Sequence, residues 1–138
     1  MNKFLVFLLA STLMIDTAIA LDVQASVSVL STTALIVNVN AEIDPIVRGN
    51  SQTIITEVTD GTDPIEGALV TVSVTYASGT KNEWCSDLTN SSGISVCTHT
   101  IGGSSTPGIF TVNSTATKEN YAPGIGYTTF NVITATTT

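Results

Sequence analysis

The stretch 83–98 holds both cysteines of the sequence and constrains the fold more than any other segment. Its middle, Thr89–Gly93, is a polar run that ends in glycine, which is typical of a turn between two strands. Folding the stretch about this turn places Cys85 opposite Cys97. Directly opposed residues of an antiparallel pair lie close enough for an S–S bond, so the sequence predicts a disulfide-closed β-hairpin.

The two faces of this predicted hairpin differ in polarity, because successive side chains of a strand point to opposite sides. One face carries large apolar side chains and is expected to face the core: Trp84, Leu88, Ile94 and Val96. The other face carries both cysteines and Ser95, and His99 continues it. The predicted disulfide therefore staples an outward-facing edge of the sheet.

Apolar and polar residues alternate with period two along most of the remaining chain, which indicates β-strands. Strands are expected at Leu35–Ile43, Thr53–Thr59 and Ala68–Tyr76, and two more lie on either side of a polar loop at Lys118–Gly126. The inner faces are predicted to be Ile54, Thr56 and Val58; Val70, Val72, Val74 and Tyr76; Phe110, Val112, Ser114 and Ala116; and Thr128, Phe130 and Val132.

No segment beyond the first twenty residues shows the 3.6-residue period of an amphipathic helix, and Thr, Val and Ile dominate. The fold is therefore predicted to be all-β. Short strands separated by Gly, Pro, Asn and Asp favour an antiparallel two-sheet sandwich of about seven strands, with a closed barrel as the alternative.

The first twenty residues have the pattern of a secretory signal peptide. Lys3 precedes the apolar run Phe4–Ala10, and the small residues Ala18 and Ala20 form a cleavage motif, with cleavage expected after Ala20. The alternative is a membrane anchor, for which the run is short. No later run is long enough to span a bilayer, so the mature chain is expected outside the cytoplasm without membrane insertion.

The charge of the chain limits its partners. The net charge is −7, and removal of 1–20 leaves 3 basic and 10 acidic residues with the same net charge. Such a chain repels polyanions, which disfavours nucleic acid and anionic membranes as partners. Two cysteines without a His or Cys cluster indicate a disulfide of a secreted protein rather than a metal site.

Several turn and strand motifs follow one another along the chain. They are Gly49–Ile54, Val58–Asp60, Pro64–Val72, Thr89–Gly93, Gly108–Val112 and Ala116–Lys118. In these motifs the sequence resembles bacterial and archaeal Ig-like surface domains of the invasin/intimin type. The resemblance implies an extracellular seven-strand module that spaces, adheres or assembles. The expected organisation is a signal peptide at 1–20, a strand and linker at 21–34, the Ig-like sandwich at 35–133 and a Thr-rich tail at 134–138.

Catalysis and cofactor binding are not expected. His99 is the single histidine, and neither a Gly-x-Ser-x-Gly motif nor a second histidine accompanies it. Asp60, Asp63 and Glu66 share one predicted loop, where their oxygens are candidate Ca²⁺ ligands. A solvated acidic turn is the alternative.

Two Asn-x-Ser/Thr sequons begin at Asn90 and Asn113 and are candidate N-glycosylation sites. Asn90 lies at the tip of the predicted turn and is the better acceptor. Asn113 points outward from a predicted strand, where a glycan has less room.

The leading interpretation is a secreted, non-enzymatic structural or adhesive module with a protein or surface partner. A carbohydrate-binding module is the alternative, with Trp84, Tyr121 and Tyr127 as the aromatic candidates. An additional strand predicted at Val23–Val29 either forms an edge of its own domain or adds to a neighbouring subunit and builds a fibre.

Overall fold

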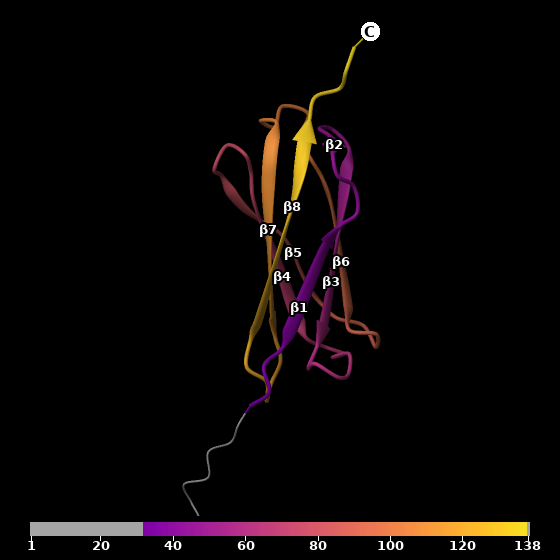
Figure 1. Ribbon diagram of the computed structural model, residues 1–138, viewed down its shortest axis with the longest axis vertical. Coiled ribbons are helices and arrows are strands. Elements are labelled where there is room, and N and C mark those ends of the chain that lie inside the picture. The colour runs from indigo at the N-terminus through magenta and orange to yellow at the C-terminus, as the bar shows by residue number, and fades with distance from the viewer. Residues whose placement is uncertain (1–31, 138) are drawn as a thin grey trace, which may run out of the picture. The chain divides into compact units, whose positions relative to one another are not determined.

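The computed structural model describes residues 32–137, which fold into eight β-strands in two sheets (Figure 1). The strands are β1 (Ile36–Ala41), β2 (Ile46–Val47), β3 (Ser51–Thr59), β4 (Leu69–Thr75), β5 (Lys81–Leu88), β6 (Ile94–Thr100), β7 (Gly108–Thr117) and β8 (Gly124–Ile133). The predicted all-β sandwich is confirmed. The expected signal peptide and the Val23–Val29 strand lie outside the described residues.

One sheet has three strands in the order β1-β3-β6, and the other has five in the order β2-β8-β7-β4-β5. Neighbouring strands are antiparallel except that β2 runs parallel to the end of β8. Within the part described, the chain starts and the last strand ends at opposite ends of the sandwich (Figure 1).

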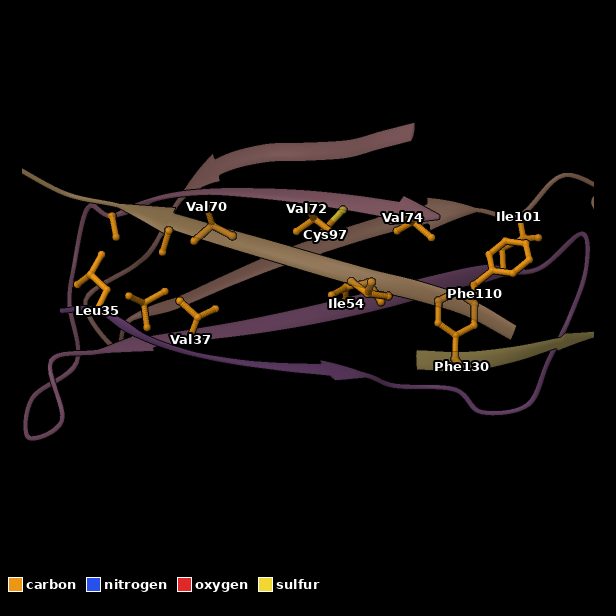
Figure 2. Packing of buried hydrophobic residues seen from close by; sticks show 14 of the residues in the cluster. Leu35, Val37, Ile54, Val70, Val72, Val74, Cys97, Ile101, Phe110 and Phe130 are labelled. Carbon is orange, nitrogen blue, oxygen red and sulfur yellow. The ribbon is translucent and has the colours of Figure 1, made fainter. Parts of the chain in front are cut away.

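The core lies between the sheets, and most of its side chains come from the predicted inner faces of four strands. In β3, β4, β7 and β8 the alternation places apolar residues inward with few exceptions. Figure 2 shows Leu35 and Val37 at one end of this core and Ile101, Phe110 and Phe130 at the other. Period-two patterning was therefore sufficient to identify the buried face of each of these strands.

Two hydroxyl groups meet inside this core. Thr56 of β3 and Ser114 of β7 are completely buried, and their side-chain oxygens lie 3.0 Å apart across the two sheets. A buried hydroxyl needs a hydrogen-bond partner, and here each supplies the other. The pair makes Thr and Ser acceptable at inner positions, as the alternation predicts.

A buried glutamine organises the connection from β1 to β2. The Gln52 amide is fully buried; its Nε2 donates to the Ile43 carbonyl at 2.6 Å, and its Oε1 accepts from the Ile43 N–H at 3.0 Å. The side chain therefore pairs with backbone as a neighbouring strand does. The sequence did not predict β2, because a two-residue strand between Pro45 and Gly49 carries no alternation.

The start of β8 differs from the expected loop at Lys118–Gly126, because the strand begins at Gly124. At Gly124 and Gly126 an added Cβ would collide with the carbonyl oxygens of Leu35 and Val37. Glycine here lets β1 cross close over β8. The polar-loop prediction is therefore wrong over its last three residues.

The predicted hairpin at 83–98 is wrong. β5 pairs with β4 in the five-stranded sheet, whereas β6 pairs with β3 in the three-stranded sheet. The turn between them passes from one sheet to the other. Thr89 holds it there, since its buried hydroxyl donates to the Ile65 carbonyl at 2.6 Å and accepts from the Ala68 N–H at 2.9 Å.

The predicted faces of β6 are inverted. Ser95 and Cys97 are buried, whereas Val96 is 56% exposed and Ile94 is half-buried. Leu88 of β5 is also 58% exposed. Alternation determines which residues share a face of a strand, but not which face is covered by the other sheet. A disulfide-bonded cysteine is apolar, so the face of β6 that carries Cys97 is as suitable for the core as the face that carries Val96.

Candidate functional site

A disulfide joins the two sheets. Cys85 of β5 and Cys97 of β6 are bonded, with their Cα atoms 5.9 Å apart. Cys97 is only 2% exposed, and Figure 2 shows it beside Val72 within the core. The bond therefore connects edge strands of opposite sheets from inside the sandwich, and the expected outward-facing staple is wrong.

A β-bulge in β5 lies directly next to Cys85. The β4–β5 register shifts between Val72, which pairs with Cys85, and Ser73, which pairs with Glu83, so Trp84 is the extra residue. An extra residue interrupts alternation and lets consecutive side chains turn to the same side. Both Trp84 and Cys85 accordingly pack against the core.

Trp84 belongs to an aromatic cluster beside the disulfide. Its ring stacks on His99 with centroids 4.4 Å apart, and its Nε1 donates to the Tyr76 hydroxyl at 3.1 Å. Tyr76 in turn stacks on Phe110 at 4.7 Å, and Phe110 contacts Phe130. The half-buried indole thus already has one ring stacked on it and its N–H bonded, which counts against its stacking on a sugar.

His99 lies on the same face as Ser95 and Cys97, as predicted, but this face is the inner one. The expected outward position of His99 is wrong because the cysteine-bearing face of β6 is the one that the other sheet covers. The Trp84–His99 stack crosses from one sheet to the other, so no pattern local to either strand could reveal it. Within residues 32–137, no three His, Cys, Asp or Glu residues gather to form a metal-binding group.

The acidic loop after β3 is held by its own backbone. The Asp60 carboxylate accepts the N–H groups of Thr62 and Asp63 at 2.9 and 2.8 Å. These hydrogen bonds stabilise the charged form and lower the pKa of the exposed Asp60 carboxyl. Asp63 and Glu66 are exposed in the same loop and, as just noted, form no metal-binding group with Asp60.

The two sequons occupy different surroundings. Asn90 is exposed in the turn between β5 and β6, and its Oδ1 accepts the N–H groups of Ser92 and Ile94 at 2.9 and 3.0 Å. The Asn90 backbone N–H donates to the Ile94 carbonyl at 2.9 Å, and no hydrogen bond of its side-chain Nδ2 is found among the described residues. Asn113 is half-buried in β7, between Ser73 of β4 and Tyr127 of β8.

The remaining aromatic candidates also differ in exposure. Tyr121 is half-buried and packs against the core, whereas Tyr127 is 62% exposed on the outer face of β8. Of Trp84, Tyr121 and Tyr127, the structure leaves Tyr127 as the ring that is open to a ligand.

Comparison with solved structures identifies the type of sandwich. The D0-D1 domain of intimin matches 75% of the chain with a TM-score of 0.51 and 20% sequence identity. The chain folds like an intimin Ig-like domain. It spans half the length of that intimin structure. A scan against protein-family models finds no match, and neither does a search of curated proteins.

Two other structures match with lower TM-scores and 12% identity. They are the alkylpurine DNA glycosylase AlkC of Pseudomonas fluorescens bound to DNA containing an abasic site analog, with a TM-score of 0.44, and the sporulation control protein Spo0M of Bacillus subtilis, with a TM-score of 0.47. They cover 72% and 74% of this chain, and 30% and 50% of the respective structures.

The cross-sheet disulfide has an implication for the compartment. Disulfides persist in oxidising environments, so the Cys85–Cys97 bond points to a location outside the cytoplasm. Within the described part of the chain, no helix is long and apolar enough to cross a membrane.

Proposed function

We propose that this chain is a secreted or cell-surface, non-enzymatic Ig-like module with a structural or adhesive role toward a protein or surface partner. The intimin-like sandwich closed by a buried Cys85–Cys97 disulfide carries this proposal. A domain in which the described chain starts at one pole and the last strand ends at the other also suits a spacing element (Figure 1).

Labelling of cells with an antibody against the folded domain tests the proposal. We expect intact cells of the producing organism, or their medium, to carry the signal, and external protease to remove the cell-bound part. Permeabilised cells serve as the control. A signal that needs permeabilisation and survives protease would contradict a surface or secreted location.

A second candidate function is carbohydrate binding, and the exposure of Tyr127 favours it. An exposed tyrosine ring supplies an apolar face for a sugar together with a hydroxyl that forms hydrogen bonds. A glycan array separates this function from the first, because a purely structural module gives no selective signal. Tyr127→Ala should abolish such a signal, whereas Tyr121→Ala, at a half-buried ring, is the matched control.

We further propose N-glycosylation at Asn90 and not at Asn113, in an organism that modifies such sequons. Asn90 is exposed in a turn, whereas Asn113 is half-buried between two neighbouring strands. Peptide mapping of the secreted protein with and without glycosidase measures occupancy. A glycan found on Asn113 alone would reverse the assignment.

Assembly through Val23–Val29 remains our proposal for fibre formation. This segment precedes Thr33, whose carbonyl accepts the Ala122 N–H at 3.0 Å. It either completes an edge of its own domain or adds to an edge of a neighbour. Deleting 21–31 should abolish polymers and leave a folded monomer if the strand is donated, and a full-length protein that stays monomeric at high concentration contradicts donation.

A further inference from the structure

One face of the sandwich carries almost no charge. The three central strands of the five-stranded sheet, β4, β7 and β8, contain no Asp, Glu, Lys or Arg, although the chain has a net charge of −7. Their outward side chains are mostly hydroxyl and amide groups: Thr71, Ser73, Thr75, Thr111, Asn113, Thr115, Tyr127, Thr129 and Asn131. Outward charges on this sheet occur on the edge strand β5, at Lys81 and Glu83. We call the outer surface of β8, β7, β4 and β5 the neutral face.

The neutral face also gathers exposed apolar side chains. Among the described residues, eight large hydrophobic side chains are exposed, and five of them lie on this face. These five are Leu69, Leu88, Ile109, Ile125 and Tyr127. Leu69 and Leu88 are direct cross-strand partners, so they form one continuous apolar contact. Exposed apolar residues concentrated on one surface mark a site of association.

The charge distribution favours a second copy of the same chain as the occupant. Two copies that each carry −7 repel one another, and the repulsion is smallest where the contacting surfaces hold no charge. The central strands β4, β7 and β8 of the neutral face are such a surface. A strongly charged partner, in contrast, would find no complementary group on the central strands.

The area of the face is sufficient for a dimer. Strands of about nine residues at roughly 3.3 Å per residue, and four strands at roughly 4.8 Å spacing, give on the order of 600 Å² per copy. The total of about 1,200 Å² lies at the lower limit of specific protein interfaces. A reversible dimer of moderate affinity is expected.

A glycan is less well matched to this face than a second copy. Sugar recognition relies on aromatic rings and directed polar groups. Tyr127 is the single aromatic side chain described on the neutral face, and the four aliphatic side chains there have no counterpart in a polar glycan. A second copy offers the same five apolar side chains as counterparts.

We propose that two copies of this chain associate through their neutral faces, sheet against sheet about a two-fold axis. The proposal deepens the structural role proposed above and rests on it. In a two-fold arrangement each side chain near the axis meets its own counterpart, so one substitution acts twice.

The test is the molar mass of the secreted protein, measured by size-exclusion chromatography with light scattering over a concentration series. Thr111→Glu places a charge on β7, an inner strand of the face, since Thr111 is exposed and pairs with Thr75 and Thr129 on its two neighbours. Thr98→Glu is the matched control, because Thr98 is an exposed strand threonine on the outer face of the other sheet. Circular dichroism and thermal unfolding verify that both variants are folded.

We expect a dimer for the wild type and for Thr98→Glu, and a dissociation constant raised about tenfold or more for Thr111→Glu, because opposed like charges are repulsive. Added salt should strengthen the dimer, since it screens the repulsion between acidic copies without weakening an uncharged contact.

Four results would overturn the proposal. A wild type that stays monomeric throughout the series excludes the dimer, and a Thr111→Glu variant that dimerises as well as Thr98→Glu assigns the contact to another surface. Loss of the dimer on deleting 21–31, with Thr111→Glu unaffected, assigns it to the N-terminal segment. A monomer that is retained on a neutral polysaccharide resin, and released by Tyr127→Ala, assigns the face to glycan. None of these results bears on the proposed surface or secreted location, which the cell-labelling experiment tests separately.

Discussion

Replacing both cysteines by alanine removes the covalent link between the sheets. The bond joins residues 12 apart in sequence, and a closed loop of that length lowers the entropy of the unfolded chain by an amount worth about 3 kcal/mol at 25 °C. For a domain of about 100 residues, a loss of this size lowers Tm by roughly 14 °C. Alanine is preferred to serine because Cys97 is 2% exposed and a hydroxyl there would be buried.

Equilibrium unfolding in urea measures the effect on three samples: oxidised wild type, reduced wild type and the Cys85→Ala/Cys97→Ala variant. The two samples without the bond should both lose about 3 kcal/mol of unfolding free energy, and the variant should lose the larger amount because the buried sulfurs are also removed. A loss below about 1 kcal/mol in both would refute the reasoning that the bond limits the unfolded chain.

Two further substitutions and one titration test local features of the fold. Thr89→Val leaves two buried backbone groups without their hydroxyl partner and should lower the unfolding free energy by about 2 kcal/mol, whereas Thr89→Ser should restore most of it. Gly126→Ala should destabilise the domain by about 2 kcal/mol or more in thermal unfolding, because its Cβ meets the β1 backbone, and Gly103→Ala, with open space around it, is the control. Asp60 should titrate by NMR below the ordinary pKa of an aspartate; its lowered pKa stabilises the fold above the unfolded pKa, and this contribution is lost as pH falls through the folded pKa.

Much of the fold follows from period-two patterning. In β4 and β7, buried Val and Phe alternate with outward-facing Thr and Asn, and the inner positions could be predicted one by one. The reason is physical: each of these strands lies inside a sheet with one covered face, so polarity alone determines which side is buried.

The pairing of β5 and β6 could not be predicted in the same way. Their turn has the composition of a hairpin, but Thr89 bonds to the loop before β4 and sends the two strands into different sheets. Polar turn residues specify a reversal of the chain, and the destination of each strand depends on contacts distant in sequence. Cys97 and Val96 are both apolar, so local polarity did not indicate which of them faces the core.

The candidate binding surfaces likewise differ in whether they could be predicted from local sequence. The sequence identified Tyr127 as an aromatic candidate and placed Asn90 at a turn, because exposed tips and outward strand positions follow from local pattern. It did not identify the Trp84–His99 stack, which forms between two sheets, nor the neutral face. The neutral face becomes visible only when the order of β8, β7, β4 and β5 is known.

The intact mass of the protein from the organism that makes it, recorded without reducing agent, tests the central claim most directly. An extracytoplasmic Ig-like module predicts a mature chain that begins at Leu21, with Cys85 and Cys97 oxidised and the mass lower by two hydrogens than that of the reduced chain. Fragmentation identifies the first residue, and reduction restores the two hydrogens. A protein that retains Met1 and carries two free thiols would contradict the account.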